Sequence, residues 1–243
     1  MQRNRADYRG WSIVKLKWVA LLILILGVGA ALYWNGSVLA DRSDGWRSLF
    51  DGNSLTGWSA LDRQDPGSGW KARKGVLSSV GHTGDLVTVG QYGDFELSLE
   101  WRVSKGANSG IIYRVGPGEG AAFQTGPEYQ ILDNLNAEDR HQPNHLAGSL
   151  YDIAAPLTDL TKPVGQWNRT RIVVRGWKIE HWLNGQKIVD VDLASAEGKA
   201  LIAKSKFADS SQFASFWQGR IALQDHGDLV SFRRIKIRDL NKS

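Results

Sequence analysis

The chain has 243 residues, of which 42% are hydrophobic and 23% charged, and these values exclude a disordered or fibrous protein. It contains no cysteine, which excludes disulfides, thiolate metal sites and cysteine nucleophiles. The formal net charge is +5, but residues 1–40 carry +4 of it through five basic residues and one acidic residue. The remaining 203 residues are nearly neutral and hold no basic cluster, so we predict no nucleic-acid partner.

Residues 1–40 have the layout of an export segment. A basic stretch ends at Lys17, an uncharged apolar run follows from Trp18 to Trp34, and Val38-Leu39-Ala40 supplies small-residue positions before Asp41. The run is longer than the roughly 7–15 apolar residues of a signal peptide and shorter than the ~20 residues that span a bilayer. The sequence therefore predicts an apolar helix that is either a signal peptide cleaved after Ala40 or an uncleaved membrane anchor. In both cases the basic flank stays cytoplasmic and the domain is periplasmic or extracellular.

The chain after residue 41 is predicted to form short strands separated by glycine-rich turns. Residues 94–103 alternate strictly between apolar and polar, which indicates a half-buried antiparallel strand with Trp101 in the core. Residues 169–192 predict three linked strands, and Asn184-Gly185 is typical of a tight hairpin turn with two positive φ angles. Further strands are predicted at 70–73, 76–80, 86–89, 109–115, 128–133, 219–224 and 229–238, with one short helix at 194–204. About ten to twelve strands in one domain predict an all-β sandwich or jelly roll.

The segment Gly126–Asp133 concentrates polar chemistry on a predicted strand. Glu128 and Gln130 share one face of it, whereas Tyr129, Ile131 and Asp133 share the other. A carboxylate beside an amide suits hydroxyl recognition or metal binding, and a solvated outer face is the alternative.

Two loops add ionisable groups. The loop from Asp133 to Asp152 contains His141 and His145, which are candidate bases or ligands, although a solvated loop histidine is common. Residues 221–228 include Gln224 and His226 and have the composition of a hard-cation or acid–base site, with the alternative that Asp228 only caps the turn.

The segment Glu180-His181-Trp182 alternates on a predicted strand. His181 is interpreted as a structural histidine. Trp182 is either a platform for a sugar ring or, more commonly for a strand tryptophan, part of the core. No nucleophile elbow, P-loop, HExxH motif or dinucleotide fingerprint is present, which removes support for serine-triad hydrolysis, phosphoryl transfer and hydride transfer.

Several ordered elements together resemble the 3-keto-disaccharide hydrolase family. They are Leu49-Phe50-Asp51-Gly52, Leu55-Thr56-Gly57-Trp58, Asp94-Phe95-Glu96-Leu97, Glu100-Trp101-Arg102, Asn108-Ser109-Gly110-Ile111, Tyr113-Arg114, Gly126-Pro127-Glu128-Tyr129-Gln130, Trp167-Asn168, Glu180–Gly185, Ser205-Lys206-Phe207 and Ile221–Asp228. The resemblance covers about residues 46–240. It implies a concanavalin- or laminin-G-like jelly roll of two antiparallel sheets, acting outside the cytoplasm on glycosides oxidised to a ketone at sugar carbon 3.

That activity would need one base, a group that stabilises an enolate, and an acid for the leaving group. From residue type and pattern, we predict His145 or Glu128 as the base, with Lys206 and Arg114, or a divalent metal, stabilising the enolate. The candidate substrate-binding residues are Gln130, Gln224, Arg114, Tyr113 and Trp182, and the candidate metal ligands are Glu128, Asp133, His145 and His226. Two alternatives remain, which are a non-catalytic carbohydrate-binding module and a surface scaffold domain.

Overall fold

The computed structural model describes residues 45–62, 64–117 and 120–240. The predicted export segment and its apolar helix lie outside these residues. Among the residues that are described, no helix is both long and apolar enough to cross a membrane.

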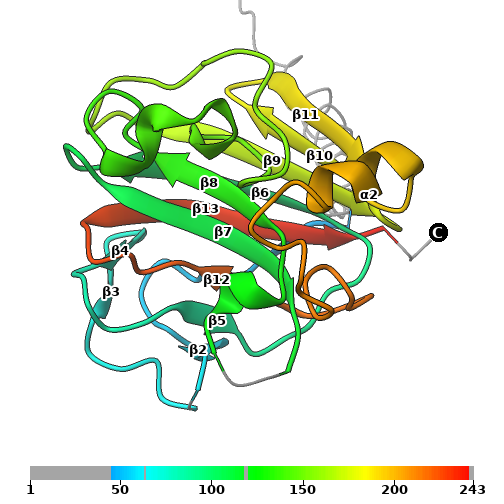
Figure 1. Cartoon of the computed structure of the whole chain (residues 1–243). Helices are drawn as coiled ribbons and strands as arrows, with labels where there is room; N and C mark the ends of the chain where they lie inside the picture. Colours follow the sequence, from blue (N-terminus) through cyan, green and yellow to red (C-terminus); the bar gives the residue numbers. More distant parts are fainter. Residues whose placement is uncertain (1–44, 63, 118–119, 241–243) are drawn as a thin grey trace, which may run out of the picture. The chain divides into compact units, whose positions relative to one another are not determined.

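Two antiparallel sheets make up the domain (Figure 1). The larger sheet has the order β11-β10-β9-β6-β13-β4-β3, with β1 also paired to β13, and the smaller has the order β2-β5-β12-β7-β8. The strands of the larger sheet are β1 (Arg47–Ser48), β3 (Trp70–Arg73), β4 (Val76–Ser79), β6 (Phe95–Val103), β9 (Asn168–Arg175), β10 (Lys178–Leu183), β11 (Gln186–Asp192) and β13 (Val230–Asp239). The strands of the smaller sheet are β2 (Trp58–Ala60), β5 (Leu86–Thr88), β7 (Asn108–Val115), β8 (Glu128–Leu132) and β12 (Arg220–Leu223).

This architecture confirms the predicted all-β jelly-roll sandwich. The predicted hairpin is also present, since Asn184 and Gly185 have φ angles of 49° and 95° between β10 and β11. The predicted helix is α2 (Ala196–Ile202), whose N-cap Ser195 accepts a hydrogen bond from the Gly198 N–H. The described residues also contain three 3₁₀ turns, namely η1 (Ala122–Gln124), η2 (Glu138–His141) and η3 (Pro143–His145).

A hydrophobic core fills the space between the two sheets. The alternation of β6 places Phe95, Leu97, Leu99 and Trp101 in it with at most 1% exposure, as predicted. The indole N–H of Trp101 donates to the Thr170 hydroxyl at 2.8 Å, so the polar atom of this buried ring is satisfied.

His181 is a polar residue inside this core, where it connects β7 to the loop at Gly148. It is fully buried, and its ring nitrogens lie 2.9 Å from the Tyr113 hydroxyl and 3.0 Å from the Gly148 carbonyl oxygen. Nδ1 donates to that carbonyl, so Nε2 accepts from the hydroxyl. The predicted structural role of His181 is confirmed. The prediction that Tyr113 binds substrate is corrected, because its hydroxyl is committed to His181 inside the core.

We expect His181 to make the fold sensitive to acid. Burial lowers its pKa from 6.5 to about 4, so its contribution to stability is complete above pH 6.5 and is lost as the pH falls through 4. The loss amounts to about 3 kcal/mol. Urea unfolding of the wild type and His181→Phe at pH 7, 5.5 and 4 measures it. At pH 7 the variant is expected to have a smaller free energy of unfolding than the wild type, and that free energy should decrease less as the pH falls from 6.5 to 4. Parallel pH profiles of the two proteins would contradict the lowered pKa of His181.

Candidate active site

Strand β8 points Glu128 and Gln130 away from the core. Their neighbour Tyr129 packs between the sheets, with its ring 4.7 Å from that of His181, so the alternate residues face the outer surface of the smaller sheet. The predicted shared face of Glu128 and Gln130 is thereby confirmed.

On that outer surface lies a cavity of about 180 Å³, which we call the inner pocket. It is lined by Asn108, Phe123, Glu128, Gln130, Tyr151, Lys206, Gln224 and His226. The structure thus brings five of the predicted site residues together from separate parts of the chain, and these are Glu128, Gln130, Lys206, Gln224 and His226.

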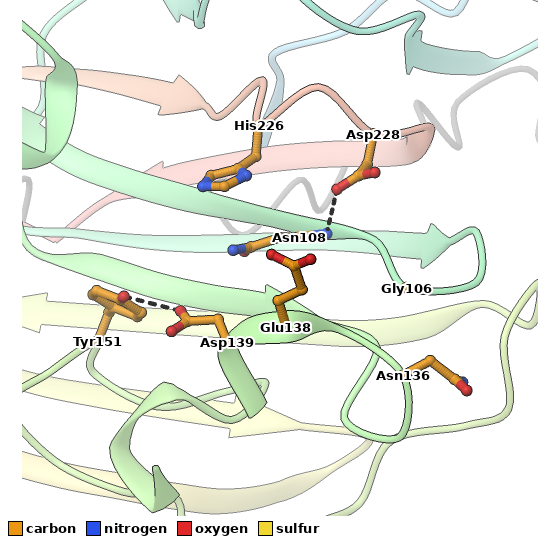
Figure 2. Close-up of a pocket in the computed structure, with 8 residues that line it drawn as sticks. All are labelled: Gly106, Asn108, Asn136, Glu138, Asp139, Tyr151, His226 and Asp228. Carbon is orange, nitrogen blue, oxygen red and sulfur yellow. Dashed lines mark hydrogen bonds between the residues drawn. The ribbon is translucent and has the colours of Figure 1, made fainter. Parts of the chain in front are cut away.

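A second cavity of about 700 Å³ adjoins the inner pocket, and we call it the outer trough. Asn108, Tyr151 and His226 line both cavities. Figure 2 shows the trough, with the Glu138 carboxylate from the η2 segment pointing toward the side where His226 and Asp228 lie in the loop after β12, and with the Asp139 carboxylate turned to the Tyr151 hydroxyl.

Glu128 is the ionisable group at the floor of the inner pocket. It is 6% exposed, and its side chain leans over Gly110 of the paired strand β7, where a Cβ atom would lie 2.0 Å from Oε1. Burial raises its pKa to about 8, the attraction of Lys206 opposes the rise, and the charges of Asp85 and Asp139 add to it. Near neutral pH both protonation states of Glu128 are populated, which suits proton transfer.

Lys206 carries the positive charge of the inner pocket. Its Nζ lies 4.3 Å from the centroid of the Tyr151 ring and 4.7 Å from that of Phe123, and these aromatic faces hold the ammonium group by cation–π attraction. Its backbone N–H donates to Asp152 Oδ2 at 2.6 Å, which fixes the loop that follows α2.

Two amide side chains of the inner pocket have unpaired atoms. Gln130 is 1% exposed, and neither Oε1 nor Nε2 has a hydrogen-bond partner in the part of the chain that the structure describes. The buried Asn108 Oδ1 is unpaired among the same residues. Unpaired buried polar atoms cost free energy, so these amides suit a ligand that brings its own hydroxyl or carbonyl groups.

His145 holds the wall of the site rather than lining it. Its Nδ1 lies 2.7 Å from Asp139 Oδ1, its Nε2 lies 3.1 Å from Asp152 Oδ1, and its ring stacks on Tyr151 with centroids 4.5 Å apart. The Tyr151 hydroxyl donates to the other oxygen of Asp139 at 2.9 Å. Burial, followed by this hydrogen bond, raises the Tyr151 pKa well above its usual value, so the phenol stays protonated.

The sequence profile of the family described as the 3-keto-alpha-glucoside-1,2-lyase-like domain matches residues 45–238. The chain belongs to this family. Membership confirms the resemblance and the prediction of an enzyme that acts on glycosides.

Individual relatives agree with this assignment. A 3-keto-disaccharide hydrolase of Bacteroides thetaiotaomicron is 30% identical over 231 residues, which cover 82% of this chain and 80% of that protein. The crystal structure of a predicted glycosyl hydrolase from Parabacteroides distasonis superposes with a TM-score of 0.77 at 31% identity, covering 82% of this chain and 95% of the other. A Bacillus subtilis protein of unknown function with a galectin-like fold has a TM-score of 0.51 at 13% identity, covers 80% of this chain and 98% of its own, and supports the fold alone.

Three predicted substrate-binding residues line neither cavity, and these are Tyr113, described above, Arg114 and Trp182. Arg114 is 3% exposed, and its guanidinium donates to the Gly93 and Gly176 carbonyl oxygens and to Asp94 while lying over the ring of Trp177. Its role is therefore to join loops at the end of the sandwich. This corrects the predictions that Arg114 binds substrate and that it stabilises an enolate together with Lys206.

Trp182 lies on the larger sheet. The Arg171 guanidinium covers its ring at 3.7 Å, and its indole N–H donates to Glu180 at 3.0 Å. Both the face and the polar atom of this ring are occupied by the protein itself. The prediction that Trp182 is a sugar platform is therefore corrected.

The predicted metal ligands do not gather at one point. Asp133 accepts hydrogen bonds from the Gly106 and Leu135 N–H groups and from the Asn136 amide, which keep its pKa below the usual value although burial opposes them. Its carboxylate stabilises a turn, and Asp133 lines neither of the two cavities. Among the described residues, no three His, Asp or Glu side chains form a group that could hold a metal ion. The divalent metal stays a prediction, and no step is assigned to it.

Sequence reasoning gave no role to three residues that line the inner pocket, namely Asn108, Phe123 and Tyr151. Asn108 did carry a signal, since it is a polar residue directly before the predicted strand 109–115, and Tyr151 lies in the loop 133–152 that contains the two candidate histidines. Phe123 carried none, because its position depends on how η1 folds over the smaller sheet.

Proposed function

We propose that this chain cleaves 3-keto-glycosides, including 3-keto-disaccharides, by elimination followed by addition of water. The observation that carries the proposal is the pairing of Glu128, whose pKa is about 8, with the Lys206 ammonium and the unpaired Gln130 amide in one small cavity. A ketone at C3 makes the hydrogen at C2 acidic, so a base of this strength is matched to the reaction. The paired carboxylates of ordinary glycosidases are not required.

In the first step, the Glu128 carboxylate takes the proton from C2, and the electrons of that C–H bond form the C2=C3 bond of an enolate. The Lys206 ammonium and the Gln130 N–H groups stabilise the negative charge on O3. The enolate then collapses, the C3 carbonyl re-forms, a C1=C2 double bond forms, and the bond from C1 to the leaving oxygen breaks. A proton from the His226 imidazole, which lines the same cavity, completes the leaving alcohol.

The second step adds water to the enone. The water oxygen bonds to C1, its proton passes to the His226 imidazole that protonated the leaving alcohol, and C2 regains a proton from Glu128, which gives the free 3-keto sugar. The sum is hydrolysis, with no change in oxidation state.

We assign a positioning role to His145. Both of its ring nitrogens already contact carboxylates, so neither is free to accept a proton from C2. By holding Asp139, it orients Tyr151, whose ring supports the Lys206 ammonium.

The proposal is tested by incubating the full chain with a 3-keto-disaccharide and with its unoxidised parent in D₂O. We expect cleavage of the keto sugar alone and one deuterium at C2 of the product, above an enzyme-free control for spontaneous exchange. Because Glu128 can return to C2 the proton that it removed, deuterium in the product supports the elimination, whereas an unchanged rate of cleavage for a substrate that carries deuterium at C2 would contradict it. Saturable binding of both sugars without turnover would support the carbohydrate-binding module instead. Repeating the assay with a chelator tests the divalent metal, which unchanged activity would contradict.

Export belongs to the same proposal. The basic and apolar pattern of residues 1–40 supports it, and fractionation of cells that express the full chain tests it. A chain that begins at Asp41 in the soluble exported fraction indicates a cleaved signal, and a full-length chain in the membrane fraction indicates an anchor. Recovery in the cytoplasm would contradict export.

A further inference from the structure

The outer trough shares three lining residues with the inner pocket. If the proposed function is correct, the keto sugar occupies the inner pocket and the leaving group occupies the trough. Gln130 and Glu128 are buried and line the inner pocket alone, whereas Asn108, Tyr151 and His226 line both cavities and form the passage between them. A keto sugar whose C3 carbonyl meets Gln130 and whose C2 meets Glu128 directs the bond at C1 toward that passage. The leaving group then occupies the trough.

The trough is acidic. The carboxylates of Glu138, Asp139 and Asp228 line it (Figure 2), and apart from the imidazole of His226 its lining holds no basic side chain among the described residues. Asp228 accepts the Asn108 N–H at 2.9 Å, and Asp139 accepts the Tyr151 hydroxyl, so both carboxylates are fixed in place.

Unpaired amide oxygens lie along the same path. The buried Asn108 Oδ1, in the passage, is unpaired among the described residues, as are Oε1 and Nε2 of Gln130, which is 99% buried and faces the inner pocket. A ligand that enters from the trough therefore meets carboxylate and amide oxygens, which need N–H or O–H donors. Hydroxyl and ammonium groups satisfy them, whereas a carboxylate or sulfate adds negative charge beside three carboxylates.

We propose that the outer trough is a leaving-group subsite that selects polyhydroxylated leaving groups without negative charge, and that favours an amine-bearing sugar over a neutral one. Glu138 and Asp228 are its specificity-determining residues. The inference rests on the proposed function and names the substrate class of the same site.

The test uses three 3-keto-disaccharides that differ only in the leaving sugar, which is a hexose, a 2-amino-2-deoxyhexose or a hexuronate. We expect kcat/KM for the wild type to decrease in the order amino sugar, neutral sugar, uronate, with about tenfold between the extremes at low salt. The difference is expected to shrink as the ionic strength rises, because the trough is open to solvent.

The variants Glu138→Gln and Asp228→Asn are each expected to reduce the ratio of kcat/KM between the amino-sugar and uronate substrates by about threefold, from about ten to about three. The amide introduced by Asp228→Asn keeps an oxygen that accepts the Asn108 N–H, so the passage keeps its shape. Glu197→Gln, on the first turn of α2, is the matched control and should leave the spread unchanged.

The outcomes separate the two claims. Failure to cleave any of the three substrates overturns the proposed function. Cleavage with equal kcat/KM for all three overturns the leaving-group inference and leaves the function standing. A wild-type spread that neither variant narrows also overturns the assignment to Glu138 and Asp228.

Discussion

Replacing Glu128 by glutamine is expected to abolish turnover of a 3-keto-disaccharide and at the same time to stabilise the fold. Loss of a positioned base lowers kcat by about 10²–10⁴-fold, and KM is expected to change little because glutamine keeps the shape of the side chain. For the wild type, kcat/KM should rise about tenfold per pH unit up to about pH 8 and then level off, since the base must be deprotonated. More than a tenth of the wild-type activity in Glu128→Gln would contradict the assignment.

The gain in stability follows from the direction of the Glu128 pKa shift. A carboxyl group whose pKa is raised from 4.5 to about 8 contributes its full stability below pH 4.5 and loses it as the pH rises through 8. At pH 8 the buried charge then costs about 4 kcal/mol, which glutamine avoids. We expect the Tm of the variant to exceed that of the wild type by roughly 5–15 °C at pH 8 and to match it near pH 4.5. The exposed Glu138→Gln is the control, and a pH-independent difference would contradict the raised pKa.

If Glu128→Gln both loses activity and gains stability, the catalytic carboxylate destabilises the folded protein. The cost is maintained because the same burial that destabilises the Glu128 carboxylate makes it a stronger base near neutral pH. His181 titrates in the opposite sense over an overlapping range, so the two groups partly cancel in the pH profile of the wild type. Comparing variants with the wild type at each pH separates them.

Local periodicity predicted the parts of the site that depend on one strand. The period of two assigned Glu128 and Gln130 to one face and Tyr129 to the core, and the same rule placed Trp101 and His181 inside. These assignments hold because a strand that packs against a core fixes every alternate side chain without reference to its partners.

The sequence could not predict the position of Arg114, because a bulge breaks the period there. In the pairing of β12 with β7, Arg220 faces Val115 and Ala222 faces Ile112, so two residues of β7 oppose one residue of β12. Arg114 has a φ angle of 54°, which turns its side chain to the end of the sandwich. Its partners Gly93 and Gly176 lie in loops that are distant in sequence, so no local sequence pattern predicts these contacts.

The loops that close the inner pocket were also beyond sequence reasoning. Phe123, Tyr151 and Lys206 come from three segments that meet only because the jelly roll brings them over the smaller sheet. Their mutual contact is a cation–π arrangement, which has no fixed spacing along the chain.

Gly110 provides the second large effect, since we expect Gly110→Ala to lower kcat/KM by about 10²-fold or more. Its backbone is extended in β7, so alanine brings no φ strain, but the new Cβ would lie 2.0 Å from Oε1, 2.7 Å from Cδ and 2.9 Å from Cγ of Glu128. Either the carboxyl group moves away from C2 of the substrate, or the two strands separate. Both responses displace the base, and a displacement of about 1 Å is enough for such a loss.

A double-mutant cycle in urea unfolding identifies the cause of that effect. In the wild-type background, Gly110→Ala is expected to cost about 1–3 kcal/mol through overpacking. In the Glu128→Ala background, the three clashing atoms are absent, so the same substitution should cost much less, and the interaction term should exceed about 1 kcal/mol. If Gly110→Ala lowers the free energy of unfolding equally in the two backgrounds, the alanine destabilises β7 itself. The contact between Glu128 and this glycine would then not hold the carboxyl group in place. A large interaction term, together with the loss of activity in Gly110→Ala, would instead make the missing side chain at position 110 the reason that a carboxyl group fits on the floor of the pocket.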